Sequence, residues 1–275
     1  MTSTTITGTG NGPAARQADA PSFVNTLQSE WTKLRTLRST PITLAIAAAL
    51  VIGLSALITW AAYGSTPRHR TLTDQLDVLT AGWFAGLLTA MVLGVLVVTN
   101  EYSSGMVIST FLATPKRVRV LLAKVLAFSV LLLVIAELIS FVTFFLSHAI
   151  ASAFPRFYDP AIGDHNVLRG VIGIGLTAVL AGLMGVGLGA LLRNAAAAIA
   201  VGVGISFVLP LVFLALPSSI QNPLLEYWPT QAGSQVREVA RQAHSLTAWW
   251  GLGDFALFIV ILLVAAGYAL VKRDA

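Results

Sequence analysis

Long apolar stretches separated by short polar segments fill most of the chain. Six of them reach the roughly 20 residues that a helix needs to cross a hydrocarbon core about 30 Å thick. They are Pro41–Ala62, Val78–Thr99, Leu121–Ile150, Leu168–Leu192, Ala196–Leu216 and Gly251–Val271. The alternating polarity that is typical of membrane β-barrels is missing from the sequence. The pattern therefore predicts an all-α polytopic membrane protein whose transmembrane domain, 41–275, has six transmembrane helices.

A shorter apolar pattern precedes the first span. Five residues recur every three or four positions, which places them on one face of a helix: Phe23, Leu27, Trp31, Leu34 and Leu37. Lys33 and Arg35 lie beside this stripe, where basic side chains meet lipid phosphates. We expect an amphipathic interfacial helix over 22–40, after a disordered tail over 1–21 that lacks the apolar core of a signal peptide. An ordinary membrane anchor and a lever beside a cytosolic partner both fit this helix.

The polar segment 100–119, between the second and third spans, has too few consecutive apolar residues to cross a bilayer. Ser103–Gly105 is suited to open a short helix that follows Glu101, and Pro115 must end that helix. Lys116 and its basic neighbours come next. A loop on the positively charged side of the membrane explains the basic residues, but it leaves the helical segment unexplained.

Charge and composition agree with this picture. Hydrophobic residues make up 56% of the chain and charged residues 11%, with a mean hydropathy of +0.81. The net charge of +5 does not indicate nucleic acid as a partner, because the basic residues lie at span ends. Eleven Lys and Arg residues lie on the side of both termini and six on the other. The asymmetry predicts cytoplasmic termini in a multi-pass membrane protein.

Several kinds of chemistry are missing from the sequence. There is no cysteine, and the four histidines are scattered, so we expect no metal site and no catalytic residue. No phosphate-binding loop of the G-x-x-x-x-G-K-[ST] type occurs, and neither do hydrolase motifs. We therefore expect that the chain is not an enzyme and binds no cofactor itself.

One acidic residue lies in the middle of the third apolar stretch. An ionised carboxylate at mid-membrane costs about 2.5–3.5 kcal/mol, so Glu137 is expected to face the bundle interior. Ser140 and Phe144 share roughly its face. A hydrogen-bonded packing residue, a place on a translocation path and a proton relay are the three readings that this position allows.

The fourth apolar stretch is rich in small residues. Five of them fall at alternating spacings of three and four and so line one face: Gly175, Ala178, Gly182, Gly185 and Gly189. Small residues let membrane helices approach closely. We expect them to pack within the chain, with a dimer seam as the alternative. The short turn at Arg193 and Asn194 predicts a tight antiparallel pair with the fifth span.

The segment 217–250, between the fifth and sixth spans, mixes prolines, aromatics and apolar residues. Because Pro223 and Pro229 bound its apolar pieces, it is expected to form short helices at or in the outer interface.

Three motifs together resemble the type-2 ABC transporter permeases, over nearly the whole chain from Ser22. They are Gln28-Ser-Glu-Trp-Thr-Lys-Leu-Arg35, Glu101-Tyr-Ser-Ser-Gly105 with Leu112-Ala-Thr-Pro-Lys-Arg117 and Leu122-Ala-Lys124, and Pro229-Thr-Gln-Ala-Gly233. Family loops often carry Thr where this chain has Met106.

The resemblance implies a role for each of these segments. The segment that touches a separate ABC ATPase would be a coupling helix containing Glu101, Tyr102, Ser103, Ser104, Gly105, Pro115, Lys116 and Arg117. The 22–40 helix would be the connecting helix, and 217–250 the outer gate. ATP and Mg²⁺ would be bound by the ATPase, and two permease copies, identical or different, would enclose one export pathway for an amphiphilic small molecule, drug, peptide or lipid-like substrate by alternating access.

Two other functions stay open. A non-transporting membrane anchor, regulator or self-protection (immunity) protein would work without any ATPase. A secondary transporter is disfavoured, because Glu137 is taken as a lone intramembrane acid and the sequence shows no inverted repeat.

Overall fold

The computed structural model describes residues 22–36, 39–65, 72–106, 117–154, 162–164, 166–238 and 245–272. These residues form helices and turns, and no strand occurs among them. Within these ranges six helical elements are long and apolar enough to cross a membrane. The chain is thus an all-helical, multi-pass membrane protein. The predicted tail 1–21, as well as Leu37, Pro115 and Lys116, lies outside the described residues.

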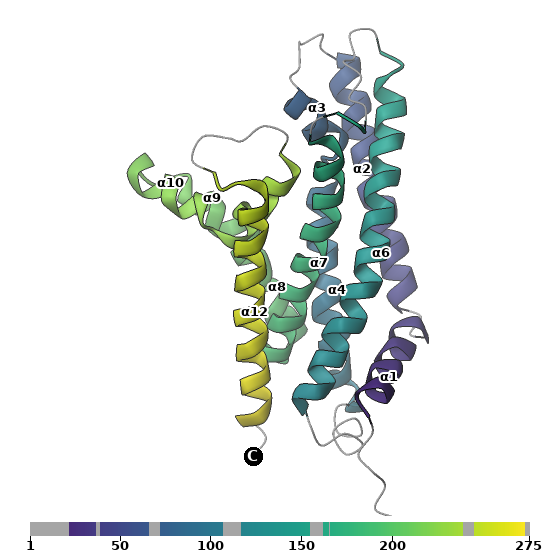
Figure 1. The fold of residues 1–275 in the computed structure, drawn as a ribbon, viewed down its shortest axis with the longest axis vertical. Helices are drawn as coiled ribbons and strands as arrows, with labels where there is room; N and C mark the ends of the chain where they lie inside the picture. Colours follow the sequence, from purple (N-terminus) through teal and green to yellow (C-terminus); the bar gives the residue numbers. More distant parts are fainter. Residues whose placement is uncertain are drawn as a thin grey trace, which may run out of the picture.

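The six membrane-length elements form the body of the fold (Figure 1). They are α2 (Ser39–Ser65), α4 (Trp83–Ser103), α6 (Arg117–Ala151), α7 (Val167–Leu192), the run α8 (Ala195–Val203), η1 (Gly204–Val208) and α9 (Leu209–Phe213), and α12 (Ala248–Lys272). The short helix α1 (Phe23–Thr36) and the end of α12 lie at one end of the molecule, called the α1 end below. The short helix α3 (Leu72–Leu79) lies at the opposite end, the α3 end.

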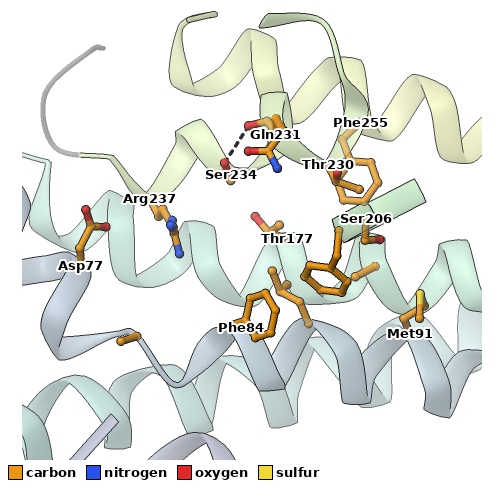
Figure 2. Close-up of a pocket in the computed structure, with 14 residues that line it drawn as sticks. Asp77, Phe84, Met91, Thr177, Ser206, Thr230, Gln231, Ser234, Arg237 and Phe255 are labelled. Carbon is orange, nitrogen blue, oxygen red and sulfur yellow. Dashed lines mark hydrogen bonds between the residues drawn. The ribbon is translucent and has the colours of Figure 1, made fainter. Parts of the chain in front are cut away.

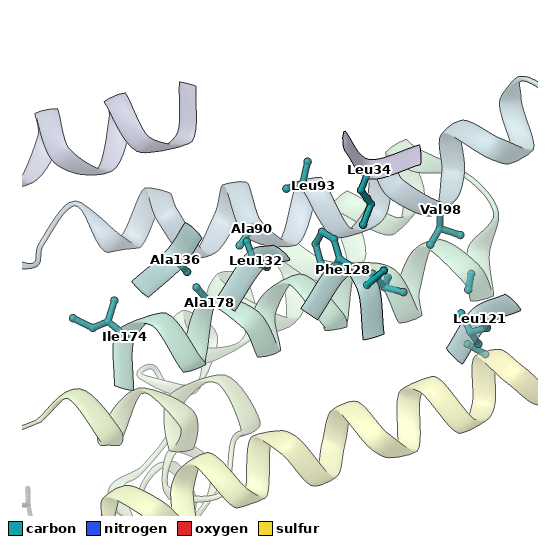
Figure 3. Packing of buried hydrophobic residues seen from close by; sticks show 14 of the residues in the cluster. Leu34, Ala90, Leu93, Val98, Leu121, Phe128, Leu132, Ala136, Ile174 and Ala178 are labelled. Atoms are coloured by element: carbon teal, nitrogen blue, oxygen red, sulfur yellow. The ribbon is translucent and has the colours of Figure 1, made fainter. Parts of the chain in front are cut away.

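Helix α7 is the centre of the bundle and packs against α4, α6, α8 and α12. Its small residues permit this. A Cβ atom on Gly185 would overlap the carbonyl oxygen of Met91 in α4, and one on Gly182 would lie 2.9 Å from the Phe128 ring of α6. The five small residues of the predicted stripe are all buried against other helices of the same chain. Figure 3 shows Ala178 in the same core, between α4 and α6.

The second span begins at Trp83 and not at Val78 as predicted, because a turn at Thr80–Gly82 separates it from α3. The Gly82 amide donates a hydrogen bond of 2.9 Å to the Ser55 hydroxyl of α2. A side chain at position 82 would overlap the α2 backbone at Val51. Glycine is therefore required where the turn meets α2. The sequence pattern does not reveal the break between the two helices, because the apolar stretch continues across it.

The fifth span is short and irregular. It starts from a tight turn, in which Arg193 adopts a left-handed conformation with φ of 53° and Asn194 caps α8 by accepting a hydrogen bond from the Ala197 amide. One turn of π-helix, η1, interrupts the span before Pro210. Since a proline lacks an amide hydrogen, the local hydrogen-bond pattern has to change near it.

The segment between the last two spans forms short helices. They are α10 (Ser218–Glu226), α11 (Pro229–Ser234) and the 3-10 turn η2 (Gln235–Arg237). Helix α11 packs on α12 and α7. The Trp228 indole donates a hydrogen bond of 2.8 Å to the Ile205 carbonyl of η1, which ties this segment to the fifth span.

Candidate functional site: a buried charge cluster at the α1 end

Four charged side chains from three helices meet at the α1 end of the bundle. Lys33 Nζ lies 2.7 Å from Glu30 Oε1 and 3.0 Å from Glu101 Oε1. Lys124 Nζ lies 2.7 Å from Glu30 Oε2 and 2.9 Å from Glu101 Oε1. Each carboxylate therefore binds both ammonium groups, and we call these four residues the charge cluster.

The charge cluster is buried and has no net charge. Glu30 is 1% exposed, Lys124 5% and Glu101 8%, while Lys33 reaches the surface more. The loss of one partner of a buried ion pair strongly destabilises a protein, because the other charge stays buried without compensation. The cluster therefore fixes α1 against α4 and α6 only as long as all four groups are present.

The charge of Lys33 is held by its two partners. Burial by itself lowers the pKa of Lys33, but hydrogen bonding and the negative charge of Glu30, followed by those of Glu101, outweigh it. The pKa of Lys33 is consequently raised above the ordinary value of 10.5. Lys33 remains protonated throughout the physiological range.

The face that helix α1 presents to the bundle is rotated from its predicted apolar stripe, and Leu34 belongs to both. Thr26, Glu30 and Leu34 are its buried residues, and the predicted stripe residues Leu27 and Trp31 pack at the side of this face. Phe23 is exposed at the start of the helix, and Arg35 is exposed at its end. The buried line is thus rotated toward Glu30, because ion pairing gives this acid a stable buried position.

Of the predicted coupling residues, Glu101–Gly105 lie at and just after the end of α4, and Arg117 begins α6. Glu101 belongs to the last turn of α4, so its carboxylate lies near the C-terminal end of that helix. Ser103 and Ser104 are exposed, and Gly105 ends the helix with φ of 71°. A side chain at position 105 would be strained in that left-handed conformation.

Two further residues of the predicted coupling segment contact other helices. The Tyr102 ring lies 5.4 Å from the guanidinium carbon of Arg193, at the turn that joins α7 to α8. Arg117, the first residue of α6, donates a hydrogen bond of 3.2 Å to the Leu270 carbonyl in α12. The two ends of the loop between α4 and α6 therefore contact α1, α7 and α12.

The predicted path residues of α6 face α7 within the chain. The Ser140 hydroxyl donates a hydrogen bond of 2.7 Å to the Val171 carbonyl, and Phe144 is 1% exposed. The Glu137 carboxyl lies against Gly175, and its two oxygens have no hydrogen-bond partner among the described residues. These three residues therefore lie at the contact between α6 and α7 within one chain.

The sequence pattern did not identify two members of the charge cluster. Glu30 lies in the sequence motif Gln28–Arg35 and Lys124 in the motif Leu122–Lys124, but neither motif predicted a buried ion pair. A signal was present, since Glu30 and Lys33 lie one helical turn apart and Lys124 is the single cation within an otherwise apolar stretch of α6. Asp254 was also overlooked as a second acid within a membrane-length helix, α12.

No group of three metal-binding side chains comes together among the described residues. A scan of protein-family models and a search of curated proteins found no match to this chain.

Proposed function

We propose that this chain is the transmembrane permease subunit of an ATP-driven ABC transporter that exports an amphiphilic substrate. ATP and Mg²⁺ would be bound and used by a separate ATPase subunit, and a second permease, the same or different, would complete the pathway. The α1 end would face the bacterial cytoplasm, in agreement with the distribution of Lys and Arg along the sequence.

The charge cluster is the observation that carries this proposal. A detached ATPase moves a permease only if the surface on which it pushes is rigidly connected to the spans. The cluster joins α1 to both helices that flank the α4–α6 loop, through Glu101 before the loop and Lys124 after it. A force on this loop would therefore move α1, α4 and α6 as one unit, and through the Arg117 contact it would reach α12.

The position of Glu101 refines the coupling hypothesis. Its carboxylate is already occupied by two lysines, so its proposed role is to hold the loop and not to contact the ATPase. The contact surface would instead include the exposed residues Ser103 and Ser104. Glu137 would act within the chain, where its carboxyl sits between α6 and α7.

Purification of the chain from native membranes, followed by identification of the ATPase that accompanies it, tests the proposal. The reconstituted complex is then compared with two variants. Ser103→Trp alters the exposed loop at the α1 end and is expected to reduce ATPase binding or turnover by about tenfold, the loss expected for about 1.4 kcal/mol. Gly163→Trp is the matched control at the α3 end, where nothing lies within 4 Å of an added Cβ.

The opposite results are equally informative. Wild-type association with the ATPase in Ser103→Trp would exclude the loop as the coupling surface. Full biological activity of the chain in membranes that contain no associated ATPase would overturn the transporter proposal and favour a membrane anchor or self-protection protein. A reporter fused after Ala275 that reads outside the cytoplasm would contradict the proposed orientation.

A further inference from the structure

A cavity of about 470 Å³ lies between α3, α4, α7, η1, α11, η2 and α12 (Figure 2). Its volume falls within the range of small-molecule sites, about 300–1,000 Å³. The described residues that line it include none from α1 or α6, so it is separate from both the charge cluster and Glu137. The cavity is therefore a distinct site, and the chemistry of its walls indicates what it would bind.

Aromatic side chains line the cavity from three elements of the fold. The Phe84 ring of α4 and the Phe207 ring of η1 lie 4.6 Å apart between centroids, with their planes at 55°. Phe255 of α12 and the thioether of Met91 also line the cavity, and each of these residues is 1% exposed. Aromatic rings attract one another at such distances, and methionine sulfur makes favourable contacts with rings. The lining is thus suited to a ligand that contains an aromatic ring.

Three polar side chains of the lining have unused hydrogen-bond donors. The Gln231 side chain extends from α11 toward Thr177 of α7 in Figure 2, and its carboxamide forms no hydrogen bond among the described residues. The same holds for the hydroxyl of Ser206 in η1, and the Thr230 hydroxyl is buried without a partner in the described part of the chain. Each of these groups can donate a hydrogen, and a carbonyl oxygen accepts hydrogen bonds without donating one. A ligand with a carbonyl group would therefore satisfy polar groups that would otherwise be costly to bury.

The charged residues of the lining are already engaged within the chain. Arg237 Nε of η2 lies 3.7 Å from Glu238 Oε1, and Asp77 of α3 also has a partner. A charged ligand would lose its hydration on entering the cavity and would find no free counter-charge among these described residues, which is costly. The lining consequently favours an uncharged ligand.

We propose that this cavity binds one molecule of an uncharged aromatic compound that carries a carbonyl group. Its ring lies against Phe84 and Phe255, and its carbonyl oxygen accepts a hydrogen bond from the Gln231 carboxamide. Phe84 is 62% exposed, so this side of the cavity borders the surface of a membrane-length helix, where a compound dissolved in the bilayer can enter. The site lies beyond the proposed transport function, because binding requires neither an ATPase nor a second copy.

Photolabelling of the full chain in a neutral detergent tests the site. The probe is benzophenone, which is uncharged and carries two rings and one carbonyl group. On irradiation its carbonyl carbon inserts into a neighbouring C–H bond, and the ketone becomes an alcohol. Saturable labelling by one molecule per chain is expected, in the peptides that contain Met91 or Phe207. Labelling that rises linearly with concentration and spreads over the exposed faces of the spans would show partition into the micelle only and would overturn the site.

Competitors built on two phenyl rings test the chemistry, each compared at the same concentration in the micelle. Uncharged benzanilide has a carbonyl group, diphenylmethane lacks one, diphenylacetate is anionic and protonated benzhydrylamine is cationic. Benzanilide is expected to compete about tenfold better than each of the others, the difference expected for one hydrogen bond or one uncompensated charge. Equal competition by diphenylmethane would exclude recognition of the carbonyl group. Equal or stronger competition by either charged compound would exclude the preference for an uncharged ligand.

Substitutions locate the bound molecule. Ala181→Phe and Ser206→Phe fill the cavity from α7 and η1 and are each expected to abolish the saturable labelling, whereas Ala265→Phe, on the exposed side of α12, is the matched control. Gln231→Leu keeps a side chain of similar size but removes its donors, so benzanilide and diphenylmethane are expected to compete equally in this variant. Saturable labelling that persists in both Phe variants, or a preference for benzanilide that persists in Gln231→Leu, would show that the compound binds elsewhere.

Discussion

Glu30 and Glu101 lie on different helices, yet they share the same two lysines. Every contact among Glu30, Glu101, Lys33 and Lys124 is 3.0 Å or shorter, and Glu30 uses one oxygen for each lysine. Each residue shares both of its partners with another member of the cluster. The effects of substitutions at the four positions are therefore expected to be coupled and not additive.

The first prediction concerns loss of one charge from the cluster. Glu101→Ala leaves two ammonium groups with one carboxylate and is expected to lower the stability of the protein by about 3 kcal/mol. Glu101→Gln combined with Lys124→Met removes a positive and a negative charge together, and it is expected to cost less than Glu101→Ala alone. Thermal unfolding in detergent measures both. Arg35→Ala, at an exposed position of α1, is the control and is expected to change stability by at most about 0.5 kcal/mol.

The second prediction concerns pH. The pKa of Lys33 is higher in the folded protein than its ordinary value of 10.5, so its stabilising contribution is complete below that value. The contribution is lost as the pH rises through the folded pKa, because the folded state then has to release a proton that it binds more tightly than the unfolded state. The midpoint temperature of thermal unfolding is therefore expected to decrease as the pH is raised above 10.5.

The variant Lys33→Arg distinguishes the contribution of Lys33 from that of other groups that lose a proton at high pH. A guanidinium stays charged at this pH, so the variant is expected to show a shallower decline than the wild type. Identical alkaline profiles of the two proteins would mean that another group is responsible.

The third prediction concerns the contact between Glu137 and Gly175. A Cβ atom at position 175 would lie 2.5 Å from the carboxyl carbon of Glu137, so Gly175→Ala is expected to destabilise the protein by about 1–3 kcal/mol. Glu137→Ala in the same chain removes the obstructing group and is expected to restore part of this loss. Gly253→Ala, with nothing within 4 Å of the added Cβ, is the matched control. A double variant no better than Gly175→Ala would contradict the steric explanation.

The fourth prediction concerns the function of Glu137. Glu137→Gln is expected to keep expression and folding, since an amide and a carboxyl are similar in shape. If Glu137 takes part in transport, substrate-stimulated ATPase activity of the reconstituted complex should change. Wild-type activity would leave only a packing role against α7.

The number and approximate position of the spans could be predicted because membrane thickness imposes a length on apolar segments. The start of the second span could not, since the turn at Thr80–Gly82 depends on the contact of Gly82 with α2 and leaves no mark in the local hydropathy. The π-turn in the fifth span was missed for a similar reason. It alters hydrogen bonding within a segment that is apolar throughout.

The site was predictable only in outline. The positions of α1 and of the loop after Glu101 followed from periodicity and charge. The burial of Glu30 could not be read from the helix itself, because it depends on Lys124, which lies 94 residues further along the chain. A hydropathy pattern assigns an acid to the polar face by default, and only the tertiary pairing reverses that assignment.

The π-turn η1 sets the rotational phase of the second half of the fifth span. One extra residue in a turn rotates everything that follows by about 100° relative to a continuous α-helix. In this protein the π-turn contains Ile205, whose carbonyl accepts the hydrogen bond from Trp228. It also contains Ser206 and Phe207, which line a cavity together with residues of α4, α7 and α11. Deletion of one residue from Gly204–Val208 would keep the span helical and apolar, yet it would turn α9 away from the segment that follows. A single inserted residue therefore determines which face of α9 packs against the segment that follows.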